Sequence, residues 1–245
     1  MDGKQFKTLV SAFRYSIHLE DIHPFNKCCH IASCFSKFAD DTKWARVVVT
    51  ELDRQKFQEG VDGLERWSKD WQLLFNVGKC KIMHLGAKNN NFSYTMNGVK
   101  MEEVVVEKDV GVMVANTLKP SQQCSSAAGK ANGVLGQISR AVNYRDKKTF
   151  LQLYKVYVRP HLEYCIQAWS PYTKFDKDKL EKVQKRAVNM VEGLKCRTYE
   201  QKLKEVGLTT LAERRERGDM IQTLRIKIGI DHVDIRRILV HDGNI

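Results

Sequence analysis

The hydrophobic pattern changes period near residues 115–120, and this change constrains the fold more than any other feature. Before it, short runs of β-branched and aromatic residues are separated by turn residues, which is typical of strands. After it, apolar residues recur every three or four positions, as at Leu151, Tyr154 and Val158, which indicates amphipathic helices. We therefore predict an α+β chain: a partial antiparallel sheet with a packed helix over 1–115, an all-helical segment over 116–230 and a tail over 231–245.

Two local patterns define elements within the first segment. Thr50 and Asp53 have the spacing of a helix N-terminal cap. A stripe of apolar residues follows that cap, and we expect all of it in the core of the packed helix: Phe57, Val61, Leu64, Trp67 and Trp71. Farther on, Asn97-Gly98 lies between two β-type segments and predicts a hairpin with a type I′ turn.

The positive charge is concentrated in the second half of the chain. The net charge is +12 in total, of which residues 1–115 carry +1 and residues 116–245 carry +11. Such an asymmetry is expected where one part of a protein binds a polyanion such as nucleic acid. The alternative is a set of solvated helix faces with no ligand.

Composition excludes several other classes. No apolar run approaches the roughly 18 residues that a membrane-spanning helix needs, and the polar N-terminus lacks a signal-peptide core. Seven irregularly spaced cysteines are typical of reduced thiols rather than of a disulfide framework. We therefore expect an intracellular protein of the nucleus or cytoplasm that makes no membrane contact.

A pair of carboxylates, Asp40 and Asp41, interrupts two β-rich runs and predicts a hairpin with the pair at or near its turn. Adjacent like charges repel unless water or a cation surrounds them. Mg²⁺ or Mn²⁺ is one such cation, because magnesium binds through one or two carboxylates together with waters and substrate phosphates. The alternative is a solvated Asp-Asp turn.

The surroundings of this pair resemble reverse transcriptases of non-LTR (LINE-type) retrotransposons. FADDTK at 38–43 is similar to their catalytic box, which reads YADD or FADD, and the resemblance runs from about Phe35 to about Gly229. Four further segments follow in family order. Residues 74–86 and 109–112 resemble blocks of the family, and residues 157–172 and 214–221 resemble those of its jockey-like and chicken-repeat-like clades.

The resemblance implies an RNA-directed DNA polymerase, a nucleotidyltransferase that uses an RNA template and a DNA primer. It implies that Asp40 and Asp41 are catalytic carboxylates that bind Mg²⁺ or Mn²⁺, and that Lys79 assists nucleotide incorporation near the departing pyrophosphate. It also implies that a strand at Gly111 holds the primer end. The basic residues expected to contact phosphates of a thumb-like helical domain are Lys119, Lys130, Arg140, Arg145, Lys147 and Lys148.

The chain departs from the family upstream of the aspartate pair. The family places a third metal-binding aspartate and a nucleotide-positioning block there, and the 37 residues before Phe38 match neither. Asp2 and Asp21 are the only acidic residues there followed four positions later by phenylalanine, and their neighbours differ from the family pattern. We therefore expect a truncated polymerase that is inactive alone, with a fuller polymerase copy in trans as a candidate partner. The alternatives are a non-catalytic nucleic-acid-binding protein and the product of a decayed reading frame.

Overall fold

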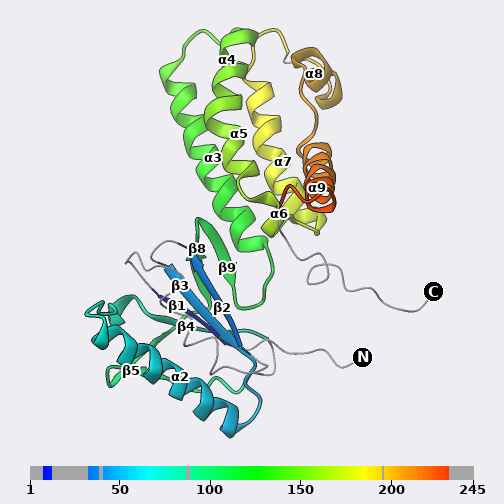
Figure 1. The fold of residues 1–245 in the computed structure, drawn as a ribbon. Helices are drawn as coiled ribbons and strands as arrows, with labels where there is room; N and C mark the ends of the chain where they lie inside the picture. Colours follow the sequence, from blue (N-terminus) through cyan, green and yellow to red (C-terminus); the bar gives the residue numbers. More distant parts are fainter. Residues whose placement is uncertain (1–7, 13–32, 39–40, 87–88, 195, 232–245) are drawn as a thin grey trace, which may run out of the picture. The chain divides into compact units, whose positions relative to one another are not determined.

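The chain divides into two compact units, Met1–Lys119 and Pro120–Ile245. The computed structural model describes residues 8–12, 33–38, 41–86, 89–194 and 196–231 (Figure 1). Each unit is described by itself below. The first contains small sheets and one long helix, and the second is helical, so the mixed α+β composition predicted from the sequence is confirmed.

A five-stranded sheet forms the centre of the first unit, in the order β2-β3-β1-β4-β7. Neighbouring strands are antiparallel except for β4 and β7, which are parallel. The strands are β1 (Thr8–Ala12), β2 (Ser33–Phe38), β3 (Asp41–Arg46), β4 (Lys81–His84) and β7 (Glu102–Glu103). Because β1 lies between β3 and β4, the first strand of the described ranges is the middle strand of this sheet.

The long helix α2 (Glu51–Asp70) begins at the cap that the sequence predicts. The Thr50 hydroxyl accepts a hydrogen bond from the Asp53 amide at 3.2 Å, and the Asp53 carboxylate accepts one from the Thr50 amide at 3.0 Å. This reciprocal capping box satisfies two amides that have no partner within the helix. The bonds from Thr50 to the Asp53 carboxylate also lower the pKa of Asp53.

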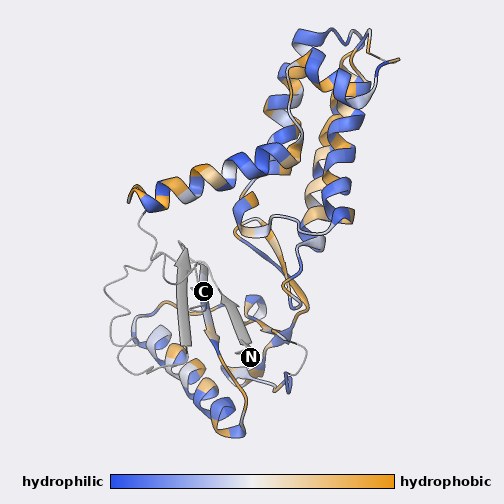
Figure 2. Cartoon of the chain, turned by 90° about the vertical axis from the view of Figure 1, so that its right-hand side faces the viewer, coloured by the Kyte–Doolittle hydropathy of each residue, from blue (hydrophilic) through white to orange (hydrophobic). Residues whose placement is uncertain are grey.

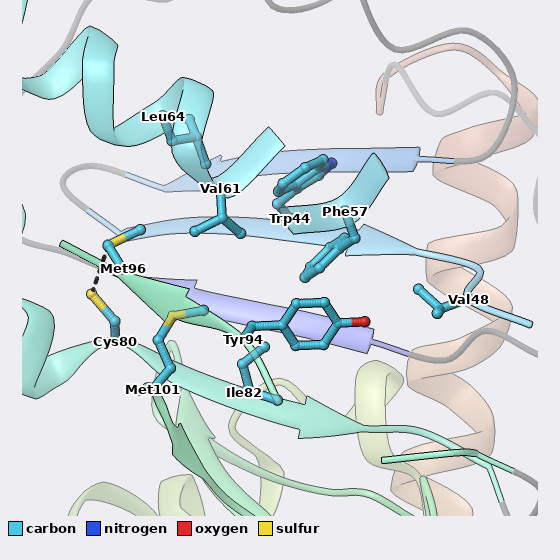
Figure 3. Packing of buried hydrophobic residues seen from close by; sticks show 10 residues of the cluster. All are labelled: Trp44, Val48, Phe57, Val61, Leu64, Cys80, Ile82, Tyr94, Met96 and Met101. Carbon is cyan, nitrogen blue, oxygen red and sulfur yellow. Dashed lines mark hydrogen bonds between the residues drawn. The ribbon is translucent and has the colours of Figure 1, made fainter. Parts of the chain in front are cut away.

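The apolar side of α2 packs against the sheet through three aromatic rings. Phe57 stacks on Trp44 of β3, with ring centres 4.5 Å apart, and meets Tyr94 edge-on at 4.8 Å (Figure 3). Val61 and Leu64 continue the buried stripe, as expected from their spacing. Arrangements of this kind contribute stability beyond the area that they bury.

The predicted core position of the last tryptophans is wrong. Trp71 is 55% exposed, and Trp67 is only half-buried, with its ring 6.4 Å from that of Trp71 and 6.5 Å from that of Phe75. The helix ends at Asp70, and Gln72 takes a positive φ of 57°. Because the chain turns there, Trp71 no longer continues the stripe that faces the sheet.

Two hairpins and a short 3-10 turn are the other elements in the described part of the first unit. Asn97 (φ 51°) and Gly98 (φ 71°) connect β5 to β6, so the predicted type I′ turn is confirmed. The remaining elements of the unit are β5 (Thr95–Met96), β6 (Val99–Lys100), β8 (Val106–Asp109), β9 (Val112–Ala115) and the 3-10 turn η2 (Val77–Lys79).

The second unit is built from helices that carry both hydrophilic and hydrophobic residues along their length (Figure 2). The longest, α3 (Ser121–Ala141), packs along α7 (Lys174–Asn189). The others are α4 (Lys147–Leu153), η3 (Tyr154–Val158), α5 (Arg159–Glu163), α6 (Ile166–Trp169), α8 (Tyr199–Val206) and α9 (Leu211–Lys227). None of the helices in the described ranges is long and apolar enough to cross a membrane.

A buried glutamine links the helices of the second unit. Gln184 of α7 is fully buried and accepts a hydrogen bond from the Tyr154 hydroxyl at 2.7 Å. Its amide nitrogen donates to the Thr209 carbonyl at 2.9 Å and to the Tyr199 hydroxyl at 3.1 Å. Burial raises the pKa of both tyrosines, so they remain neutral. One side chain therefore connects η3, α8 and the loop before α9.

Candidate functional site

The predicted carboxylate hairpin is present. Strands β2 and β3 pair in antiparallel register, and Phe38 lies opposite Asp41, so a two-residue connection closes the hairpin. Asp41 is the first residue of β3. Asp40 belongs to the connection and lies outside the described residues.

Register also places the Lys79 segment at the Asp41 end of the sheet. Ser11 of β1 lies opposite Lys43 of β3 on one side and opposite Lys81 of β4 on the other. Because β1 is antiparallel to both, the start of β3 and the start of β4 lie at the same end. Lys79 therefore precedes β4 at the end of the sheet where Asp41 begins β3.

Local bonds fix the turn that carries Lys79. The Asn76 carbonyl accepts from the Lys79 amide at 2.9 Å and from the Cys80 thiol at 3.2 Å. Burial raises the pKa of Cys80 to about 12, so the thiol remains a protonated donor. Lys79 itself is exposed, so its ammonium group is available to a ligand.

An ion pair brings the Gly111 turn to the same strand. Lys43, two residues after Asp41, pairs with Asp109 at the end of β8. Asp109 lies opposite Val112, so Val110 and Gly111 form the two-residue turn of the β8–β9 hairpin. The sequence predicts a strand over residues 110–114; the strand β9 is present but begins at Val112, and Gly111 lies in the turn before it.

The reason for the turn is the backbone conformation. Val110 has φ 42° and Gly111 has φ 86°, the two positive values that a type I′ turn requires. A positive φ is rare for a β-branched residue, because its side chain crowds the backbone there. Val110 therefore holds a conformation that its local sequence disfavours.

The sequence predicts that Asp40 and Asp41 bind a hard divalent cation at this end of the sheet. Asp40 and Asp41 offer oxygen donors, which Mg²⁺ accepts together with substrate phosphates. Within the described ranges, no group of three or more histidine, cysteine, aspartate or glutamate side chains is placed to hold a metal. The neighbouring strand β1 ends at Ala12, opposite Thr42. Asp2 and Asp21, the candidates for a third ligand, lie outside the described residues.

The predicted phosphate contacts fall into separate groups. Lys119 ends the first unit, whereas Lys130 and Arg140 are exposed on α3. Arg145 donates to the carbonyl of Ser139 at 2.9 Å and to its hydroxyl at 3.0 Å, and these bonds tie it to the end of α3.

Lys147 and Lys148 lie together on α4. They line a groove of about 450 Å³ whose other walls are Leu151, Gln152 and Lys155. Among the described residues, no acidic side chain lines this groove. Lys147 contacts Glu205 at 3.3 Å, a distance typical of an exposed ion pair that contributes little to stability.

Sequence reasoning missed a third basic surface, on α7. Its basic residues recur through the helix at Lys174, Lys177, Lys179, Lys182, Lys185 and Arg186. The regular spacing of these basic residues can be read from the sequence. It does not show which carboxylates neutralise them.

Comparison with known proteins relates the chain to one polymerase. It is 23% identical over 190 residues to the RNA-directed DNA polymerase from mobile element jockey of Drosophila funebris. The match covers 73% of this chain and 20% of that protein, so the chain spans about a fifth of its curated relative. No family model matches the chain, and no solved structure matches it. The similarity supports a relationship to the reverse transcriptases of non-LTR retrotransposons.

Proposed function

We propose that the chain is the palm and thumb portion of a reverse transcriptase of a non-LTR retrotransposon, acting on an RNA template and a DNA primer in the nucleus or cytoplasm. The observation that carries the proposal is the convergence of three sequence segments at one end of the sheet. Strand register aligns the starts of β3 and β4, and the Lys43–Asp109 ion pair adds the Gly111 turn. The similarity to the jockey polymerase supports the same function.

Each segment has a chemical role in this proposal. Asp40 and Asp41 would bind Mg²⁺ or Mn²⁺, and two such ions stabilise the attacking and leaving oxygens of phosphoryl transfer. The exposed Lys79 neutralises or protonates the departing pyrophosphate. Gly111, which has no Cβ, lets the primer end lie close to the backbone of this turn.

The second unit binds the phosphates of the nucleic acid through its basic residues. Lys147, Lys148 and Lys155 line one groove without an acidic neighbour in its walls. Phosphate contacts of this kind position a duplex without reading its sequence. A non-catalytic nucleic-acid-binding protein would use the same groove, so binding and synthesis need separate measurements.

We predict that the 245-residue chain alone does not extend a primer on an RNA template. Effective phosphoryl transfer needs both metal ions and an aligned substrate, and the sequence offers two of the three family carboxylates. A primer-extension assay in Mg²⁺ and in Mn²⁺ measures this. Addition of a fuller, Asp-to-Ala-inactivated polymerase copy tests for complementation in trans. Extension by the chain alone that is abolished in Asp40→Ala would contradict the prediction.

We predict that the chain binds a primer–template hybrid electrostatically and that the α4 groove supplies part of the contact. If four to six basic residues meet phosphates, raising salt from 50 to 200 mM should weaken binding by about two to three decades. Lys147→Glu with Lys148→Glu should lower the salt slope by about two. Fluorescence anisotropy measures both effects.

The matched control for this pair is Lys56→Glu with Arg66→Glu, which reverses two exposed cations on α2 in the first unit. It should change the slope far less than the α4 variant does. Equal losses in the two variants would show that total charge, rather than the α4 groove, determines binding.

A further inference from the structure

The outward face of α7 carries positive charge that the chain does not neutralise. Across the described part of the chain, none of its six basic side chains forms an ion pair with a carboxylate. Elsewhere in the second unit, basic residues such as Arg197 and Arg214 are paired with Glu205 and Glu163. The cations of α7 therefore lack the ion pairs that engage Arg197 and Arg214.

Two of the three acidic residues on α7 are turned into the unit. Asp176 is 1% exposed and accepts hydrogen bonds from Ser121 at 2.7 Å and from Thr173 at 2.9 Å. Glu181 accepts from the Tyr199 hydroxyl and from the Leu211 amide. Their negative charges are engaged by neutral donors of the same unit. The third acidic residue, Asp178, is exposed, so the solvent side of α7 carries one carboxylate beside its excess of cations.

Two of these cations are held in place by neutral groups of α3. The Lys179 ammonium donates to the Ser125 hydroxyl at 2.8 Å, and Arg186 donates to the Asn132 side-chain oxygen at 3.4 Å. A neutral acceptor orients a cation and leaves its charge available to a ligand. The edge between α3 and α7 is therefore a positioned row of positive charge.

An exposed aromatic ring stands at the start of this row. Phe175 is 71% exposed, and the Lys179 ammonium lies over its ring at 4.7 Å from the centroid. Phe175, Lys179, Lys182 and Arg186 follow one another at steps of four, three and four residues. Such steps place all four on one side of a helix, along about 16 Å of its axis.

An aromatic ring followed by a row of cations matches the chemistry of single-stranded nucleic acid. Bases stack on exposed aromatic rings whatever their sequence, and a basic track follows the backbone. A protein partner is disfavoured, because the cores of protein interfaces are depleted in lysine. The large exposed ring also has no described partner other than Lys179.

We propose that Phe175 is a stacking platform for an unpaired nucleobase, and that Lys179, Lys182 and Arg186 bind the phosphates of the same strand. This stacking site rests on the proposed reverse-transcriptase function only because it takes nucleic acid as the ligand. The surface is separate from the α4 groove in sequence and is defined by different residues. It would hold template or displaced strand that is not part of the duplex.

The test compares single-stranded RNA with an RNA–DNA hybrid of equal length, using the full chain and fluorescence anisotropy. Phe175→Ala should weaken binding of a uridine 12-mer about tenfold and leave hybrid binding within twofold, because one stacked base is lost. Phe175→Trp should retain the affinity, and its added fluorescence should be quenched when the oligonucleotide binds. Tyr144→Ala removes an equally exposed ring, 70% accessible, and should have no effect.

The outcomes separate the two proposals. Hybrid binding with no change in RNA affinity for Phe175→Ala would overturn the stacking site and leave the proposed function standing. An equal loss for Tyr144→Ala would also overturn it. Absence of binding to either nucleic acid by the wild-type chain would overturn both.

Discussion

Replacing Gly60 by alanine is expected to destabilise the first unit by about 3 kcal/mol, although alanine normally stabilises a helix relative to glycine. A Cβ at this position would lie 1.7 Å from the outer ring of Trp44. Trp44 is 5% exposed and stacked on Phe57, so its ring has no room to retreat. The overpacking therefore outweighs the gain in helix propensity.

Two glycines of α3 provide the matched control. Gly129 and Gly133 are exposed inside a helix, and a Cβ there would meet no heavy atom within 4 Å. Alanine at either position should stabilise the second unit by about 0.5–1 kcal/mol, because it reduces the entropy of the unfolded chain and adds no clash.

Urea denaturation followed by tryptophan fluorescence and by circular dichroism measures these changes. The two units are expected to unfold in separate steps, so each transition needs its own fit. A stabilising Gly60→Ala, or a destabilising Gly129→Ala, would contradict the packing described for α2 and α3.

Replacing Gln184 by leucine is expected to destabilise the second unit by roughly 3 kcal/mol. Leucine fills similar space, but it removes the hydrogen bonds that the buried Tyr154 hydroxyl and the Thr209 carbonyl make to Gln184. An unsatisfied buried polar group costs about 1–3 kcal/mol. The effect should be seen in the helical transition of a urea titration.

A double-mutant cycle isolates the mechanism. Tyr154→Phe removes the hydroxyl that Gln184→Leu would leave without a hydrogen bond. The double mutant should therefore lose less stability than the sum of the two single mutants, by about 0.5 kcal/mol or more. Leucine at the exposed Gln137 of α3 is the control and should change stability by less than about 0.5 kcal/mol. Strictly additive losses would show that the hydrogen bond to Tyr154 is not the source of the effect.

The features that the sequence predicted well are those determined by a few neighbouring residues. Asn97-Gly98 adopts the turn that its own backbone preferences favour, and Thr50 with Asp53 forms its cap through bonds three residues long. Such signals need no knowledge of the rest of the chain.

The features that the sequence did not predict depend on contacts between distant segments. The turn at Val110 was hidden because valine favours strands, and the Asp109–Lys43 ion pair beside it joins residues far apart in the chain. The sequence shows the six basic residues of α7, but it does not show which acidic side chains are free to pair with them. That Asp176 and Glu181 face inward follows from Ser121 and Leu211, which belong to other elements.

The central place of β1 in the sheet has a consequence for the order of folding. Thr8 pairs with Arg46 on one side and with His84 on the other. Strand β1 therefore cannot form its full pairing until these later segments have been synthesised. At a synthesis rate of about 5–20 residues per second, the second partner of β1 follows roughly 4–15 seconds after it. During that time one edge of the strand is open to pairing with other chains. The described elements of the second unit are helices, whose backbone groups bond within each helix and leave no strand edge, so aggregation during synthesis should begin at β1.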